Sequence, residues 1–128
     1  MSRRSQGAHI ERRMQWYLRV RGYRIVCANY YSPYGEIDII AHKGNTTVFV
    51  EVRSKTEKSA SLYATPAESV TAAKQRSIIK TARHYITTAF LANATYRFDV
   101  IEVIRRENGR LKINHIKNAF ICDMNNSH

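Results

Sequence analysis

The sequence predicts a single α/β (α+β) domain in which helices pack on a mixed β-sheet. Apolar residues recur at helical spacing in two segments, residues 5–22 and 65–89, and five shorter segments are rich in Ile, Val and Phe. The segments follow one another in the order αβββαββ, which favours a sheet covered by helices. The 128 residues correspond to one domain, because no Pro/Gly-rich linker divides the chain. Residues 1–4 are expected to form a basic arm and residues 122–128 a flexible tail.

The first helix is predicted over residues 5–22. Its apolar stripe at helical spacing consists of Ile10, Met14, Tyr17 and Leu18. Gly22 ends the helix at a position suited to a left-handed C-terminal cap. Glu11 lies at the edge of the stripe, so a first helix that packs on the sheet carries this carboxylate to the helix–sheet boundary.

The remaining elements are five strands and a second helix. The strands are predicted over residues 24–30, 36–42, 46–53, 95–104 and 110–116. A polar loop is predicted over residues 54–64. The second helix is expected to begin at Thr65 as N-cap, with Pro66 at the first helical position and Glu68 completing a capping box.

The turn between the second and third strands decides which of their residues face each other. With Gly44-Asn45 as a two-residue hairpin loop, Lys43 pairs with Thr46. Counting outward, Asp38 then faces Glu51, with Cβ atoms about 5 Å apart. A register shift of one residue would place these two carboxylates on opposite faces of the sheet.

Two carboxylates this close need a compensating charge, because they repel by about 3 kcal/mol at an effective dielectric constant of about 20. A divalent cation, Mg²⁺ or Mn²⁺, is one such charge, since hard cations prefer oxygen ligands and can polarise a phosphodiester. Arg53 shares the strand face of Glu51 and would stabilise negative charge on a phosphate, and Glu11 would reach the same place from the first helix. The spacing equally fits solvent-facing carboxylates beside an ordinary cross-strand ion pair between Glu36 and Arg53.

The net charge of +11, with a pI of about 10.1, favours a polyanionic partner. Nucleic acid is favoured over an anionic membrane, because no strongly amphipathic basic helix is present. No apolar run approaches the roughly 20 residues of a membrane-spanning helix, and no apolar segment follows Arg3 and Arg4, so we expect no signal peptide and a cytoplasmic location. Cys27 and Cys122 form no Cys-x-x-Cys pair, which argues against a zinc finger or a disulfide scaffold.

Basic and aromatic residues around the carboxylates are candidates for contacts with DNA. The candidates for phosphate contacts are Lys55, Lys58, Lys74, Arg76, Lys80 and Arg83. The tyrosines that could stack on bases are Tyr30, Tyr31 and Tyr34. A solvated basic face and ordinary packing tyrosines are the alternatives. Asp99 lies beside Arg97 in an apolar strand and is interpreted as half of a buried ion pair rather than as a catalytic acid.

Several runs of the sequence occur together in one known family. GEIDIIA (residues 35–41) followed by VFVEVR (residues 48–53) matches the D-x(n)-E-x-K/R pattern of restriction-endonuclease-like nucleases. Supporting runs are Gly7…Glu11, Leu18…Gly22-Tyr23…Asn29-Tyr30, Pro66-Ala67-Glu68-Ser69-Val70…Lys74-Gln75 and Arg97-Phe98-Asp99-Val100-Ile101. With these runs the chain resembles the YraN family of small bacterial proteins over about residues 7–104.

The resemblance implies a restriction-endonuclease-like αβββαβ core, similar to that of archaeal Holliday-junction resolvases. It implies that Asp38 and Glu51 are metal ligands, with the backbone carbonyl of Val52 as a third. Glu11 would match the acid on the first helix of resolvase-type nucleases. Either Gln75 or Lys74 would match the polar residue of the second helix near the scissile phosphate.

One position departs from the wider superfamily, because Arg53 stands where a lysine is common. An arginine cannot readily lose its proton, so it is a poor general base. Lys55 is the nearest lysine and shares the strand parity, so it could substitute if the strand continues. The arginine at position 53 therefore affects the expected activation of water, whereas the expected metal binding is unchanged.

The resulting hypothesis is a Mg²⁺- or Mn²⁺-dependent phosphodiesterase that acts on DNA, including branched or single-stranded DNA, as an endonuclease. The second hypothesis is a catalytically inactive nucleic-acid-binding protein in DNA processing or uptake, which the arginine at position 53 favours. A third and more distant hypothesis is an interaction protein that uses the fold only as a scaffold. Resolvase-like relatives dimerise, which leaves a homodimer open.

Overall fold

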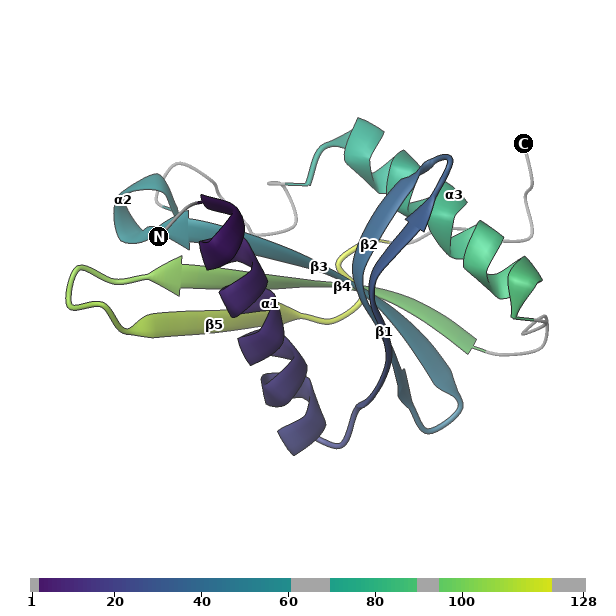
Figure 1. Cartoon of the computed structure of the whole chain (residues 1–128), viewed down its shortest axis with the longest axis horizontal. Helices are drawn as coiled ribbons and strands as arrows, with labels where there is room; N and C mark the ends of the chain where they lie inside the picture. Colours follow the sequence, from purple (N-terminus) through teal and green to yellow (C-terminus); the bar gives the residue numbers. More distant parts are fainter. Residues whose placement is uncertain (1–2, 61–69, 90–94, 121–128) are drawn as a thin grey trace.

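The computed structural model describes residues 3–60, 70–89 and 95–120, and these form an α+β domain with a five-stranded mixed sheet (Figure 1). The elements in chain order are α1 (Arg3–Val20), β1 (Arg24–Ser32), β2 (Gly35–Lys43), β3 (Thr46–Thr56), α2 (Glu57–Ala60), α3 (Ala72–Thr88), β4 (Thr95–Arg105) and β5 (Leu111–Ile116). The predicted fold class is confirmed. No helix in the described part of the chain is long and apolar enough to span a membrane.

The strand order in the sheet is β1-β2-β3-β4-β5; β3 and β4 are parallel, and the other three neighbouring pairs are antiparallel. β3 and β4 are paired along their whole lengths, from Thr46↔Thr95 to Thr56↔Arg105. Parallel neighbours need a crossover connection, and the segment between these two strands includes α3. This crossover brings α3, which is distant in sequence from β2, against the β1–β2 hairpin.

Each face of the sheet is covered by one long helix (Figure 1). On one face α1 buries its stripe against residues that include Ile39, Ala41, Val48, Val50, Ile101 and Val103. On the other face α3 buries Ile78 and Ala82 against residues that include Ile37, Ile40, Phe49, Phe98 and Val100. Burial on both faces explains why consecutive residues, and not alternate ones, are buried in the middle of β3 (residues 47–51) and β4 (residues 98–104).

The two ends of α1 differ in how well the sequence predicts them. The predicted left-handed cap is confirmed: Gly22 has a φ of +90°, and the N–H of Tyr23 donates to the carbonyl of Leu18 at 3.0 Å. The predicted basic arm is wrong in part, because Arg3 already begins the helix, and residues 1–2 lie outside the described residues. The tail predicted over residues 122–128 also lies outside them.

The boundaries predicted between the third strand and the second helix are wrong. β3 continues to Thr56 and α2 follows it, because β4 offers a hydrogen-bonding partner along the whole length of β3. Val70 and Thr71 are not helical, and α3 begins at Ala72 with Thr71 as N-cap; its hydroxyl accepts from the N–H of Lys74 at 3.1 Å. The predicted cap at Thr65 lies outside the described residues.

The β1–β2 hairpin is fixed to α3 at its turn. The hydroxyl of Ser77 donates to the carbonyl of Tyr34 at 2.8 Å, and the hydroxyl of Ser32 donates to that of Thr81 at 3.1 Å. Gly35 approaches the helix so closely that an added Cβ would overlap the Ser77 hydroxyl. These contacts hold the hairpin away from β3, which matters for the position of Asp38.

Replacing Gly35 with Ala is expected to lower the free energy of unfolding by about 1–3 kcal/mol. Gly35 has a φ of +146°, which strains any other residue, and the new methyl group would also meet Ser77. Urea denaturation measures the loss. Ser77→Ala removes the overlapping hydroxyl, so a double-mutant cycle should show that the double variant recovers part of the loss. Strictly additive effects of the two substitutions would contradict the overlap.

Candidate active site

β2 and β3 form a fork that opens where their pairing ends. The predicted hairpin register is confirmed, since the pairs run from Lys43↔Thr46 to Ile39↔Val50. The pairing stops one step before Asp38 and Glu51. Figure 1 shows the β1–β2 hairpin leaving the sheet toward α3, whereas β3 continues beside β4.

Asp38 occupies the fork with its side chain. The N–H of Val52 donates to Asp38 Oδ2 at 2.8 Å. In an antiparallel ladder, hydrogen-bonded positions alternate, so Val52 is the next position of β3 that turns its backbone groups toward β2 after Val50. The carboxylate therefore replaces the backbone partner that β2 would have supplied. The N–H and C=O of one strand residue point to the same side, so the Val52 carbonyl also faces the fork.

Glu51 is almost completely buried, with 7% of its surface exposed. Burial, and then the neighbouring charge of Asp38, raise the pKa of Glu51 from 4.5 to about 7. The cations of Lys74 and Arg53 oppose this rise, and Lys74 Nζ lies 4.0 Å from Glu51 Oε2. The two acids of the pair predicted from the hairpin register are therefore close enough for the charge of Asp38 to disfavour ionisation of Glu51.

The pKa of Asp38 is also raised, chiefly by burial and with a smaller contribution from Glu36, although the Val52 N–H partly offsets the shift. Glu11 on α1 reaches the same region. Burial and the charge of Asp38 raise its pKa, while a hydrogen bond from the Asn29 side chain lowers it. Three carboxylates from three elements, Glu11, Asp38 and Glu51, thus form what we call the carboxylate site.

Asn29 is a site residue that the sequence analysis missed. Asn29 lies in β1 with a φ of +54°, two residues after an irregularity in the strand between Ile25 and Cys27. Asparagine tolerates this left-handed conformation better than most residues. Neither periodicity nor spacing signals it, because the conformation depends on how β1 bends over β2.

The two basic candidate residues of β3, Arg53 and Lys55, differ in the acids with which they interact. The charge of Arg53 acts on both Asp38 and Glu51, which agrees with its predicted place on the same face. Lys55 does lie on the continued strand, but its Nζ is 3.0 Å from Glu102 Oε2, and both side chains are 7% exposed. Pairing of β3 with β4 thus engages Lys55 with Glu102, while its suggested roles as a replacement for the missing lysine and as a DNA contact stay predictions.

On α3, Lys74 forms an ion pair with Glu51 of the carboxylate site. The side-chain amide of Gln75 donates to the carbonyl of Val70 at 3.0 Å, so it fastens the segment that precedes the helix. Arg76 is exposed on α3. Tyr34 is 55% exposed at the hairpin turn, beside a 370 Å³ pocket that Lys80, Arg83 and His84 also line.

The alternative of an ordinary ion pair between Glu36 and Arg53 is wrong. The β2–β3 pairing ends at Ile39↔Val50, so Glu36 is paired with Tyr31 of β1 and has no partner in register on β3. Within the part of the chain that the structure describes, no ion pair joins Glu36 to Arg53. The charge of Arg53 acts on Asp38 and Glu51 instead.

The donor groups of the carboxylate site fit a hard divalent cation. Within residues 3–60, 70–89 and 95–120, no three His, Cys, Asp or Glu side chains converge on one point as a protein-only metal cage does. Asp38 and Glu51 supply carboxylate oxygens and Val52 a carbonyl oxygen, which are ligands that Mg²⁺ accepts while it keeps several waters. Burial raises the pKa of both acids, and a bound cation would favour their ionised forms.

This fold and this site define a class of protein: an α+β domain with a restriction-endonuclease-like core, in which a mixed sheet between helices carries two carboxylates on its central strands. The family described as "Uncharacterised protein family UPF0102" matches residues 10–103. The chain belongs to this family, which is also called the YraN family, so the resemblance stated from the sequence is confirmed.

Relatives named only "UPF0102 protein" match nearly the whole chain. The relative from Alkaliphilus metalliredigens is 43% identical over 117 residues, which cover 91% of this chain and 98% of the relative. The relative from Caldicellulosiruptor saccharolyticus is 41% identical over 121 residues, covering 94% and 100%. The relative from Clostridium beijerinckii is 47% identical over 105 residues, covering 81% and 83%.

Proposed function

We propose that this protein is a metal-dependent phosphodiesterase that acts on DNA, an endonuclease of the restriction-endonuclease-like or resolvase type. The observation that carries the proposal is the fork, where Asp38 accepts a hydrogen bond from the Val52 N–H and lies close enough to Glu51 to raise its pKa. Two neighbouring buried acids are notable in a protein with a net charge of +11, because most of its surface attracts anions. A DNA substrate also agrees with the cytoplasmic location expected from the sequence.

The residues of the site have different roles in the proposed reaction. Asp38, Glu51 and the Val52 carbonyl would hold Mg²⁺ or Mn²⁺, which supplies Lewis-acid polarisation of a phosphodiester and a lowered pKa for bound water. Arg53 and Lys74 place positive charge beside the two acids and would stabilise charge that develops on the phosphate. Glu11 adds a carboxylate that can orient a water molecule at the edge of the site.

Lys74 supplies a lysine side chain to the site, although an arginine stands at position 53 of β3. An arginine stays protonated and cannot accept a proton, whereas a lysine can. Lys74 Nζ lies 4.0 Å from Glu51 Oε2, so α3 brings an ammonium group to the site although β3 does not. This contact supports the catalytic hypothesis over that of an inactive nucleic-acid-binding protein.

Binding of DNA is expected to depend on the phosphate backbone and not on base sequence. Arg76 on α3 and Tyr34 at the hairpin turn are exposed on elements that flank the site, so both stay candidates for contacts with DNA. Contacts of this kind release counterions, so affinity should fall steeply with salt. A homodimer, as in resolvase-like relatives, stays a prediction.

The test is to incubate the purified protein with junction, flap, single-stranded and linear DNA in Mg²⁺, Mn²⁺ or EDTA. We expect cleavage that requires the metal and falls at least about 100-fold in Asp38→Ala, because one of the two acidic ligands is lost. Isothermal titration with Mn²⁺ should show a matching loss of metal binding. Glu107→Gln removes an exposed acid on the β4–β5 turn and serves as the charge-matched control.

Two outcomes would contradict the proposal. Cleavage that survives both Asp38→Asn and Glu51→Gln would show that another site, or a contaminating nuclease, does the cutting. Binding of DNA without cleavage in any metal would favour the second hypothesis, an inactive nucleic-acid-binding protein.

A further inference from the structure

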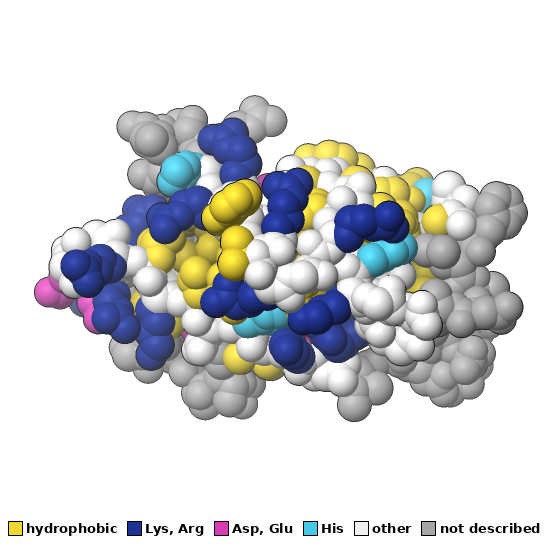
Figure 2. All heavy atoms as spheres, turned by 90° about the horizontal axis from the view of Figure 1, so that it is seen from below, with side chains coloured by type: hydrophobic (Ala, Val, Ile, Leu, Met, Phe, Trp, Pro, Cys, Tyr) yellow, Lys and Arg dark blue, Asp and Glu magenta, His cyan; other side chains and the backbone are white. Residues whose placement is uncertain are grey.

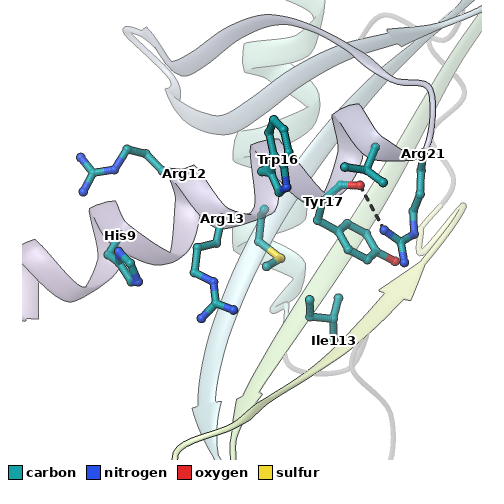
Figure 3. A pocket seen from close by; sticks show the side chains of 9 residues that line it. His9, Arg12, Arg13, Trp16, Tyr17, Arg21 and Ile113 are labelled. Carbon is teal, nitrogen blue, oxygen red and sulfur yellow. Dashed lines mark hydrogen bonds between the residues drawn. The ribbon is translucent and has the colours of Figure 1, made fainter.

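A basic surface, separate from the carboxylate site, lies along α1, between this helix and β5 (Figure 3). It is a groove of about 510 Å³, and we call it the α1 groove; its main residues are Arg12, Arg13, Trp16, Tyr17, Arg21 and Ile113. At 3.6 residues per turn, Trp16 lies about 140° around the helix from Glu11. The groove therefore faces away from the carboxylate site.

The α1 groove exposes apolar surface that the core does not use. Trp16 is 67% exposed and Val20, one turn further along the helix, is 64% exposed. The core contacts of α1 come instead from Ile10, Met14 and Leu18. A tryptophan side chain exposed to solvent is most often part of a binding surface, since its large ring offers contact area at low entropic cost.

The charged side chains that line the groove are basic. Among the residues that the structure describes, its lining contains Arg12, Arg13 and Arg21 together with His9, and no Asp or Glu. Figure 3 shows the arginines arranged around Trp16 and Tyr17, from both ends of the groove. Arg21 is already ordered, because its guanidinium lies 3.7 Å from the centre of the Tyr17 ring and donates to the Tyr17 carbonyl at 3.2 Å. This pattern is complementary to a ligand that carries both negative charge and flat apolar faces.

The basic surface continues past the groove. Tyr17 and Arg21 also line an adjoining pocket of about 350 Å³, to which Lys43 and Lys117 contribute. Figure 2 shows the face at the C-terminal end of α1, where Lys and Arg side chains alternate with hydrophobic ones and few acidic side chains are seen. Such a track suits an extended chain of anionic groups better than a single small anion.

We propose that the α1 groove binds single-stranded DNA, with Trp16 stacked on a base and the arginines on the flanking phosphates. A duplex hides its base faces, whereas a single strand presents them to aromatic side chains. Arg12 and Arg13 lie four and three residues before Trp16, on the adjacent helical turn, which allows them to reach phosphates on either side of a stacked base. This binding surface is independent of the cleavage chemistry.

The protein has a built-in reporter for the test, because Trp16 is its only tryptophan. Titration with oligothymidylate of about 15 nucleotides, in EDTA and at low salt, is expected to quench the fluorescence of Trp16. An abasic strand of the same length carries the same phosphates but no bases. It should bind more weakly and leave the fluorescence nearly unchanged.

Variants separate stacking from charge, with binding followed by the anisotropy of a labelled strand. We expect Trp16→Ala to weaken binding about tenfold and Trp16→Phe to restore most of it, because phenylalanine also stacks. Arg13→Ala should weaken binding and reduce the dependence on salt by about one counterion. Arg110→Ala removes the same charge from the β4–β5 turn, outside the groove, and should change affinity less than about twofold.

Three results would overturn the proposal. One is unchanged affinity for the single strand in Trp16→Ala, and another is equal affinity and equal quenching with a duplex of the same length. The third is a dimer, found by sedimentation, that Trp16→Ala dissociates, because a second copy would then cover the groove. The nuclease proposal is tested separately: single-strand binding that Asp38→Ala retains, in a protein that never cleaves, would remove that proposal and leave this one standing.

Discussion

Replacing Asp99 with Ala is expected to lower the free energy of unfolding by about 3–5 kcal/mol, because it breaks a buried ionic network. Asp99 is 0% exposed. Arg97 donates to both carboxylate oxygens, from Nε to Oδ1 at 2.8 Å and from Nη2 to Oδ2 at 2.9 Å. His115 Nε2 lies 2.7 Å from Oδ2, and the N–H of Asn118 donates to Oδ1 at 3.1 Å. Alanine would remove this acceptor from Arg97 Nε, His115 and the Asn118 N–H, whereas Arg97 Nη2 would keep the Tyr23 hydroxyl at 2.9 Å.

The pH dependence of this network has a definite sign. Burial alone would raise the pKa of Asp99, but the hydrogen bonds from His115 and Arg97 outweigh it, so the pKa is lowered from its usual 3.8. A carboxyl whose folded pKa is depressed stabilises the fold at pH values above 3.8. This contribution is lost as the pH falls through the depressed value. The difference between wild type and Asp99→Ala should therefore be largest near neutral pH and shrink in acid.

Urea denaturation near pH 7 and at acidic pH measures both effects. Asp99→Asn keeps part of the hydrogen bonding and should lose less stability than Asp99→Ala. Glu107→Gln, an exposed acid on the β4–β5 turn, should stay within about 0.5 kcal/mol of wild type. If Asp99→Ala were as stable as wild type but failed to cleave DNA, the residue would be catalytic and the interpretation as a structural ion pair would be wrong.

The parts of the site that the sequence predicts are those set by local geometry. The two-residue loop Gly44-Asn45 places the two strands in register, so the approach of Asp38 to Glu51 follows from counting. The helical spacing of α1 likewise places Glu11 at its edge, and the confirmed cap at Gly22 turns the chain back onto the sheet. Each of these features depends on residues within one turn or one hairpin.

The parts that sequence reasoning misjudges depend on pairing between distant segments. Lys55 is drawn into the sheet because β4, which follows α3 in the chain, pairs with β3 along its length and supplies Glu102. Lys74 meets Glu51 only because the crossover returns α3 to the fork. Spacing also predicts that the ladder continues through Asp38, whereas Ser77 and Gly35 hold the hairpin away and let the side chain replace the backbone at Val52.

Replacing Glu51 with Gln is expected to raise the free energy of unfolding in metal-free buffer at pH 8, while it abolishes metal-dependent cleavage. The folded carboxyl keeps its proton up to a pKa of about 7, and the unfolded one only up to about 4.5. Unfolding therefore releases a proton between these values, so the stability of the wild type falls as the pH rises through this window. The shift corresponds to about 3 kcal/mol once the acid is ionised. Glutamine cannot ionise and escapes this loss.

Thermal or urea unfolding at pH 4.5 and pH 8 gives the comparison. Wild type and Glu51→Gln should be similar at the lower pH and separate at the higher one. Glu102→Gln is the matched control, because Glu102 is equally buried but has Lys55 as its partner. Its replacement leaves a buried ammonium without its carboxylate and should lower stability, the opposite sign.

Addition of Mg²⁺ or Mn²⁺ at pH 8 connects this stability cost to function. A cation that binds only the folded state raises stability by RT ln(1 + [metal]/Kd), so the wild type should gain and Glu51→Gln should gain little. Equal gains in both proteins would place the cation elsewhere and contradict the carboxylate site. If the wild type alone gains, the repulsion between Asp38 and Glu51 is relieved by the metal itself. The metal-free fork would then be less stable than it could be, because its two acids are placed to bind a cation. The difference in free energy of unfolding between Glu51→Gln and wild type, in metal-free buffer at pH 8, measures that cost.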